Sequence, residues 1–132
     1  MKPILAALVI GIVLLTGCMT TYPPATTPGY RDVTPAEAKA LIDQNPDLII
    51  IDVSPVYAQG HIPGAVNYYI GDGSLDRAIP SLDPEAKYLV YCHTDAASIP
   101  GAQKLVDAGF KDVSRLQGNF KAWVDAGYPV EI

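Results

Sequence analysis

Hydrophobic runs alternate along the chain with segments of helical spacing. Residues 48–53 form a continuous, mostly β-branched run, Leu-Ile-Ile-Ile-Asp-Val, which is typical of a strand buried on both faces of a parallel sheet. Shorter runs predict further strands over residues 66–69, 87–91 and 112–116. Because helical or turn segments separate these strands, the order favours βα units, which build a mostly parallel sheet with helices on both faces.

Helix signals lie before and between the strands. The string Thr-Pro-Ala-Glu that begins at Thr34 has the spacing of a capping box with proline at the first helical position, and it predicts a helix to about Asp43. Residues 54–60 predict a short helical turn, and residues 72–80 predict a loop with a brief helix. Residues 119–126 predict a closing helix.

The first residues have the pattern of an export signal. Lys2 precedes an almost uninterrupted apolar stretch over residues 4–15, which is shorter than the roughly 20 residues of a spanning helix. The string Leu-Thr-Gly-Cys that ends at Cys18 closely resembles the bacterial lipobox, in which the cysteine becomes a lipid-modified first residue. We therefore expect residues 1–17 to be a lipoprotein signal peptide. An uncleaved anchor, or an ordinary signal peptide with a chance cysteine, is the alternative.

The segment after the predicted signal peptide indicates how the protein would be attached to a membrane. Residues 18–30 are rich in threonine and proline and predict an extended, semi-rigid tether, whereas residues 31–132 suit a single domain. Lipid on Cys18 would place this domain at the cell envelope, on an extracytoplasmic face that is either periplasmic or at the cell surface. The formal net charge is −5 and the sequence has no Lys/Arg cluster, so nucleic acid is a poor partner and membrane association is expected from the lipid.

Cys92 is the candidate reactive residue. It follows the strand predicted over residues 87–91 and precedes a helical pattern over residues 100–108. Unpaired N–H groups and the positive end of a helix dipole favour a thiolate at such a place. If Cys18 carries lipid, Cys92 has no cysteine left to pair with. An activated sulfur nucleophile is predicted, and a buried, inert cysteine is the alternative.

The segment after Cys92 is predicted to hold a substrate. Proline lacks an N–H, so Pro100 is harmless only in a first helical turn, and it disfavours helical geometry at Ile99. We therefore expect Ser98 or Ile99 to cap the helix, which would not begin much before Ala96. The sulfur is expected to point into a ring of backbone N–H groups from His93 to Ser98. The predicted substrate-binding residues are His93, Thr94, Asp95, Ala96, Ala97 and Ser98.

Two segments of the chain resemble the rhodanese family. Residues 48–67 look like its N-terminal signature, with the string Gly-His-Ile-Pro-Gly-Ala-Val-Asn that begins at Gly60. Residues 91–130 resemble its C-terminal half, and together the two cover essentially all of residues 31–132. The resemblance implies an α/β domain with a central five-stranded parallel sheet and helices on both faces. It also implies transfer of sulfane sulfur through a persulfide on Cys92.

The chain departs from this family where members that use thiosulfate carry cations. Such members typically have Arg or Lys in the loop, often where this chain has Ala97, and commonly have Arg where it has Ser54. Asp95 adds a negative charge instead. Related phosphatases need an Arg at the position of Ser98, so phosphatase chemistry is excluded. Weak use of thiosulfate is therefore expected, because backbone dipoles only partly replace a guanidinium.

The residues and the resemblance together predict a lipid-anchored sulfurtransferase that needs no cofactor. Its partners would be a small sulfur donor (polysulfide, persulfide or thiosulfate) and a thiol acceptor. No metal is expected, because Cys92 and His93 supply two ligands and a structural zinc site needs four. A catalytically inactive rhodanese-like binding module is the alternative, which the missing cations favour and the retained Cys92 opposes.

Overall fold

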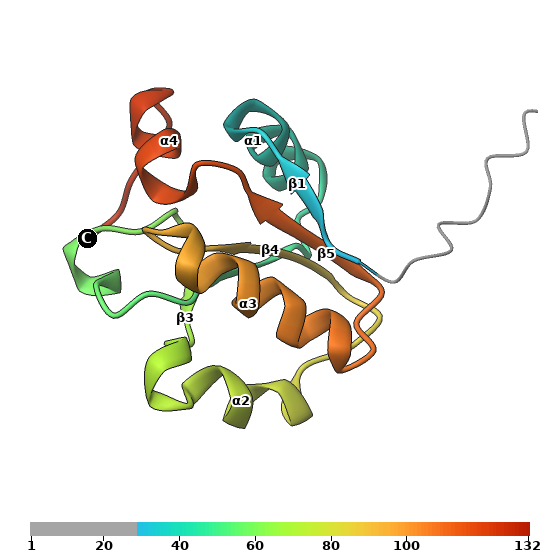
Figure 1. Ribbon diagram of the computed structural model, residues 1–132. Helices are drawn as coiled ribbons and strands as arrows, with labels where there is room; N and C mark the ends of the chain where they lie inside the picture. Colours follow the sequence, from blue (N-terminus) through green and yellow to red (C-terminus); the bar gives the residue numbers. More distant parts are fainter. Residues whose placement is uncertain (1–28) are drawn as a thin grey trace, which may run out of the picture.

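The computed structural model describes residues 29–132, which form one five-stranded parallel sheet covered by helices (Figure 1). The strands lie in the order β1-β5-β4-β2-β3. Their bounds are β1 Arg31–Val33, β2 Ile49–Asp52, β3 Val66–Asn67, β4 Lys87–Tyr91 and β5 Asp112–Leu116. The α-helices are α1 Pro35–Gln44, α2 Ser74–Ala78, α3 Asp95–Asp107 and α4 Asn119–Asp125, and the short 3-10 turns are Tyr57–Gln59, Ile70–Asp72 and Ile79–Ser81. The predicted α/β class and five-stranded parallel sheet are confirmed.

Some predictions concern residues that precede this domain. The predicted signal peptide over residues 1–17, Cys18 and nearly all of the tether lie outside the described residues. Within residues 29–132, none of the helices has the length and apolar character needed to cross a membrane.

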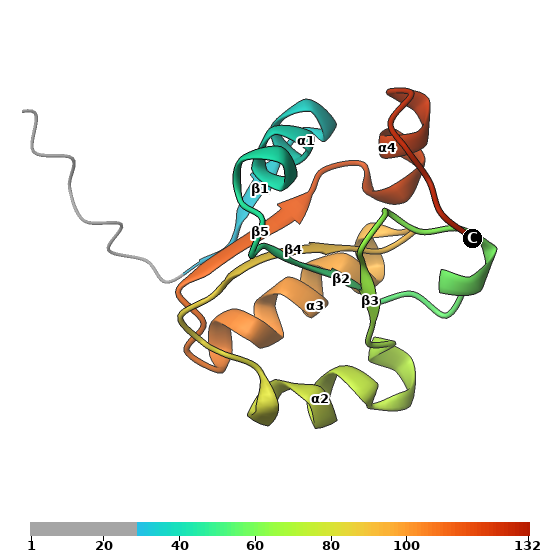
Figure 2. The same cartoon turned by 180° about the vertical axis from the view of Figure 1, so that it is seen from behind.

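Successive residues of β4 pack on opposite faces of the sheet, as the pleat of a strand requires. Tyr88 and Val90 belong to the core cluster that includes residues of α2 and α3, whereas Leu89 and Tyr91 belong to the cluster with α1 and α4. Figures 1 and 2 show these two pairs of helices on either side of the sheet. Cys92 continues the alternation and therefore lies on the α3 face.

The start of α1 confirms the predicted capping box. The Thr34 hydroxyl accepts a hydrogen bond from the Glu37 N–H (3.2 Å), and the Glu37 carboxylate accepts one from the Thr34 N–H (3.3 Å). Pro35 occupies the first helical position, where its missing N–H has no consequence. The α1 N-terminus is thus closed by its own side chains.

The start of α3 agrees with the expectation that the helix would not begin much before Ala96, but its cap differs from the prediction. The helix begins at Asp95, its N-cap is Thr94 in an extended conformation, and Pro100 lies inside it, so neither Ser98 nor Ile99 is the cap. Pro100 is exposed, so its ring projects away from the core. The prediction relied on the local preference of proline, which tertiary packing overrides at this helix.

One close contact shows how tightly α3 packs on the sheet. A Cβ atom added at Gly101 would lie 3.2 Å from Val53 Cγ2, closer than side chains normally approach. Leu105 and Ala102 are fully buried on the same side of the helix. The buried side of α3 therefore holds it against β4, β5 and Val53, which follows β2, despite the proline.

The strand β1 was not predicted from the hydrophobic pattern. It has three residues, of which Val33 alone is buried, so it carries too little alternation to be recognised. It pairs in parallel with β5, from Arg31 opposite Ser114 to Val33 opposite Leu116. The bounds predicted for β4 and β5 agree with the structure, and β2 and β3 are shorter than expected.

Candidate active site

Cys92 directly follows β4 at the carboxyl edge of the sheet, just before the Thr94 cap of α3. It is a free thiol and 3% exposed. The start of α4 holds its backbone on both sides: the Cys92 N–H donates to Asn119 Oδ1 (3.2 Å), and the Phe120 N–H donates to the Cys92 carbonyl (3.0 Å). The thiol residue is therefore fixed between the N-termini of two helices.

The first turn of α3 leaves several backbone N–H groups available. The Thr94 carbonyl accepts hydrogen bonds from the N–H groups of Ala97 (3.4 Å) and Ser98 (3.2 Å), so these two cannot belong to a ring around the sulfur, and that part of the prediction is wrong. Within residues 29–132 the Thr94 side chain makes no capping hydrogen bond. The N–H groups of residues 93–96 likewise have no hydrogen-bond partner in this part of the chain. A ligand at the thiol could take these donors.

The side chains that follow Cys92 have different surroundings. Thr94, Asp95 and Ala96 are exposed, whereas Ala97 is partly buried against the core cluster on the α3 face. The ring of His93 packs against Phe120, with centroids 4.8 Å apart, and its Nε2 is buried without a partner among residues 29–132. Over the same residues, no group of three or more His, Cys, Asp or Glu side chains could hold a metal ion.

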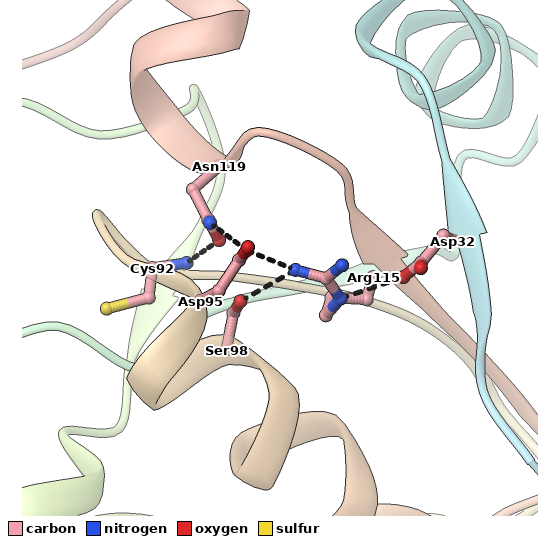
Figure 3. Close-up of polar contacts among 6 residues, drawn as sticks. All are labelled: Asp32, Cys92, Asp95, Ser98, Arg115 and Asn119. Atoms are coloured by element: carbon pink, nitrogen blue, oxygen red, sulfur yellow. Dashed lines mark hydrogen bonds and ion pairs between the residues drawn. The ribbon is translucent and has the colours of Figure 1, made fainter.

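Arg115 of β5 is a buried cation that the sequence interpretation missed. Its side chain is 6% exposed, and it lies on the α3 face behind Cys92 (Figure 3). Its Nε donates to Asp32 Oδ1 (2.8 Å), and its Nη1 donates to Asp95 Oδ1 (2.7 Å) and to Ser98 Oγ (3.1 Å). Ser98 is fully buried in this contact, so its hydroxyl faces Arg115 rather than a substrate.

This guanidinium is neutralised by carboxylates. Burial opposes the charged form of Arg115, but hydrogen bonds to Asp32 and Asp95 outweigh burial and raise its pKa. The hydrogen bonds from Arg115 and Asn119 lower the pKa of Asp95. One cation and two anions carry a net negative charge, and the Cys92 sulfur points away from Arg115 in Figure 3. Arg115 is thus not a free cation for an anionic substrate.

Asn119 joins this charged group to Cys92. Its backbone is in the left-handed region (φ 59°), which asparagine tolerates better than most residues. Its Oδ1 accepts from the Cys92 N–H, and its Nδ2 donates to Asp95 Oδ1 (2.8 Å). The sequence interpretation identified Asn119 only as a helix start. The Gly-Asn pair at a helix start was a usable signal, because both residues suit positive φ.

Asp52 closes the turn after β2. It is fully buried, and its Oδ1 accepts a hydrogen bond from the Ser54 N–H (2.8 Å). The neighbouring strand end holds Tyr91, whose hydroxyl accepts from the Ile62 N–H (3.0 Å). Burial, followed by the nearby charge of Asp52, raises the pKa of Tyr91. The phenol is therefore neutral and serves as structural support beneath the site.

The fold and the thiol define an α/β domain with a candidate nucleophile at the carboxyl edge of its sheet. Residues 34–126 match the rhodanese-like domain family, and the chain belongs to this family. The thiosulfate sulfurtransferase GlpE of Pseudomonas fluorescens (strain SBW25) is 34% identical over 103 residues, which are 78% of this chain and 92% of that protein.

Solved structures agree with this assignment. The crystal structure of the Alr3790 protein from Anabaena sp. matches with a TM-score of 0.68 and 32% identity, over 75% of this chain and 81% of that one. The solution structure of the 30 kDa polysulfide-sulfur transferase homodimer from Wolinella succinogenes matches with a TM-score of 0.65 and 25% identity, over 77% and 78%.

Proposed function

We propose that this protein is a sulfurtransferase that carries sulfane sulfur as a persulfide on Cys92. The observation that carries the proposal is the place of the thiol, at the end of β4 beside the N–H groups of residues 93–96, which have no hydrogen-bond partner among residues 29–132. Membership of the rhodanese-like family supports it, as do relatives named thiosulfate sulfurtransferase and polysulfide-sulfur transferase.

The reaction consists of two sulfur transfers. The Cys92 thiolate attacks the outer sulfur of the donor, an S–S bond forms, and the donor's own S–S bond breaks. The leaving group, sulfite from thiosulfate or a thiolate from a persulfide, departs with the electron pair. An acceptor thiolate then attacks the outer sulfur on Cys92 and releases the Cys92 thiolate, so no external oxidant or reductant is consumed. Adjacent N–H groups would stabilise the charge on the transferred sulfur.

The charges near the site favour donors whose negative charge is smaller or less concentrated than that of thiosulfate. Ala97 and Ser54 provide no cation, and the negative charge of Asp95 lies at the start of α3. The guanidinium of Arg115 is bound by two carboxylates. Thiosulfate, a dianion, would meet backbone dipoles alone, which bind it less strongly than a bidentate guanidinium would. A persulfide carries at most one negative charge, and a polysulfide spreads its two charges over a longer chain of sulfur atoms, so either is the better substrate.

Lipid on Cys18 would place this reaction outside the cytoplasm, at the envelope membrane. The support for this proposal is the lipobox-like string before Cys18 and the Thr/Pro-rich segment after it. A Cys18→Ser variant is expected to accumulate as an unprocessed precursor without palmitate labelling. Unchanged processing and labelling of this variant would refute the anchor and leave the proposed chemistry untouched.

Mass spectrometry tests the chemistry directly. The full chain is exposed separately to thiosulfate and to polysulfide, and digestion then locates any gain of one sulfur atom. We expect this gain on the Cys92 peptide with polysulfide, a smaller fraction with thiosulfate, and none in Cys92→Ser. Absence of the gain with both donors would overturn the proposal.

A binding module without catalysis is the second candidate, and the burial of the thiol favours it. Cys92 is 3% exposed, so a donor must displace neighbouring groups to reach the sulfur. If the protein is such a binding module, polysulfide is expected to bind without a covalent mass gain on Cys92. The same mass measurement therefore separates the two candidates.

A further inference from the structure

A single side-chain amide connects the thiol residue to a buried ion pair. Asn119 accepts from the Cys92 N–H with its oxygen and donates to Asp95 with its nitrogen, and Asp95 in turn binds Arg115. We propose that Asn119 is a positioning residue that, anchored by the Asp95–Arg115 pair, holds Cys92 against the first turn of α3. This inference rests on the proposed role of Cys92 as a nucleophile.

The chemistry of the two partners fixes the orientation of the Asn119 amide. The Cys92 N–H can be met only by an acceptor, and the Asp95 carboxylate only by a donor, so oxygen and nitrogen cannot exchange places. Both ends of the amide are used at once, at 3.2 and 2.8 Å. A hydrophobic side chain at position 119 would satisfy neither partner.

The anchor reaches across the sheet to the edge strand β1. Arg115 in β5 holds Asp32 of β1 with its Nε and Asp95 with its Nη1, and it is itself buried. The Asp95 side chain is 63% exposed and would otherwise be free to turn into solvent. Arg115 therefore holds the exposed Asp95 carboxylate in the position from which this carboxylate orients the Asn119 amide.

The same ion pair leaves the N-terminus of α3 free for the substrate. An unpaired carboxylate at the first helical position would compete with an anionic donor for the positive end of the helix dipole. Arg115 binds that carboxylate from the side of Cys92 opposite the sulfur (Figure 3). The network thus acts behind the nucleophile, and none of its side chains needs to touch the donor.

Asn119→Gly is the primary test because glycine suits the positive φ at this position. Its first measurement is the pH midpoint of Cys92 alkylation by iodoacetamide, which we expect to rise by about half to one pH unit. The second is sulfur transfer from polysulfide, whose kcat/KM is expected to fall about tenfold to a hundredfold as the thiol loses its position. Lys121→Met, which removes the surface Lys121–Asp125 pair on the same helix, is the matched control and is expected to change neither value.

An exchange of side chains tests whether Asn119 acts through Asp95. Asn119→Asp places two carboxylates together and is expected to be as impaired as the glycine variant. Adding Asp95→Asn to that variant restores a donor and an acceptor between positions 95 and 119, with their roles reversed. The double variant is expected to recover the alkylation midpoint of the original chain to within about 0.2 pH unit.

The outcomes separate this inference from the proposed function. An unchanged midpoint and transfer within twofold in Asn119→Gly would overturn the positioning role, as would a double variant no better than Asn119→Asp. Alkylation does not require sulfur transfer, so a shifted midpoint in a chain that never carries sulfur would support the positioning role and refute the enzyme. If Asn119→Gly fails to fold, the comparison of Asn119→Asp with the double variant decides alone.

Discussion

The starts of α1 and α3 have the same cap residue and use it differently. Thr34 and Thr94 are both N-caps in an extended conformation. Thr34 exchanges hydrogen bonds with Glu37 three positions later, whereas the corresponding position after Thr94 is Ala97, and within residues 29–132 the Thr94 side chain caps nothing. The α1 start is closed by its own side chains, and the α3 start leaves its donors open.

This difference matches the different positions of the two helix starts relative to the thiol. A reciprocal capping box satisfies two of the donors that every helix leaves unpaired at its start. At α1 those donors are satisfied by Thr34 and Glu37, and the helix packs on one face of the sheet. At α3 the open donors lie beside Cys92, where an anionic sulfur group would need them. The helix that faces the thiol thus gives up local stabilisation that the other helix keeps.

Closing the start of α3 is expected to have the largest effect. Ala97→Glu would complete the sequence of a capping box with Thr94 and place a negative charge beside the thiol, so thiosulfate kcat/KM should fall at least about tenfold. Ala97→Arg should raise it about tenfold to a hundredfold, because a charge-assisted hydrogen bond contributes roughly 1.5–3 kcal/mol. Steady-state kinetics with thiosulfate measures both changes.

Two controls accompany the Ala97 series. Ala97→Gln can form the same capping hydrogen bonds without the charge, so its effect should lie between those of Glu and the original alanine. The gain from Arg should shrink as ionic strength rises, since the first turn of α3 is near the surface. Equal rates for Glu, Gln and Arg would show that charge and capping at α3 do not influence the donor.

Opening the start of α1 is expected to affect stability alone. Thr34→Ala should lower the free energy of unfolding by about 1 kcal/mol, the usual contribution of a threonine cap. Thr94→Ala should lower it less, because its side chain makes no capping hydrogen bond among the described residues. Urea denaturation measures both, and sulfur uptake by Thr34→Ala should match the original chain. If Thr94→Ala lowers the free energy of unfolding more than Thr34→Ala does, the proposed difference between the two helix starts is wrong.

The smallest expected effect is the pH dependence of the stability that Asp95 contributes at the start of α3. Hydrogen bonds from Arg115 and Asn119 lower the pKa of Asp95, so its contribution to stability is present above the unfolded-state value of about 3.9 and is lost as pH falls below it. The difference in urea midpoint between the original chain and Asp95→Asn should therefore be constant from pH 5 to 8. It should shrink in acid, and a difference that grows in acid would contradict this assignment.

Strong local patterns made most of the fold predictable. The β-branched run of β2 and the apolar run of β4 identify buried strands, and the Thr34–Glu37 box identifies α1. Two elements were misjudged because non-local packing decides them. β1 is a strand only because it pairs with β5, and α3 continues through Pro100 only because its opposite side is packed on the sheet.

In the candidate site, the sequence predicted the nucleophile Cys92 but not the residues that hold it in place. The position of Cys92 follows from the adjacent strand, which the sequence reveals. Arg115 lies in a run that reads as a buried strand, and its partners Asp32 and Asp95 are far from it in sequence. A charged residue in a buried parallel strand signals that carboxylates must lie nearby. It does not say which ones, because that depends on the strand order.

The pairing of β1 with β5 joins the first strand of the domain to the last. Asp32 and Arg115 are separated by 83 positions in the chain and yet lie in hydrogen-bond contact. Such a contact forms only after a long loop has closed, which is slow compared with local structure. Because Arg115 also holds Asp95 at the start of α3, the surroundings of Cys92 are completed late in folding. A chain interrupted during synthesis would therefore carry the cysteine before it has the site.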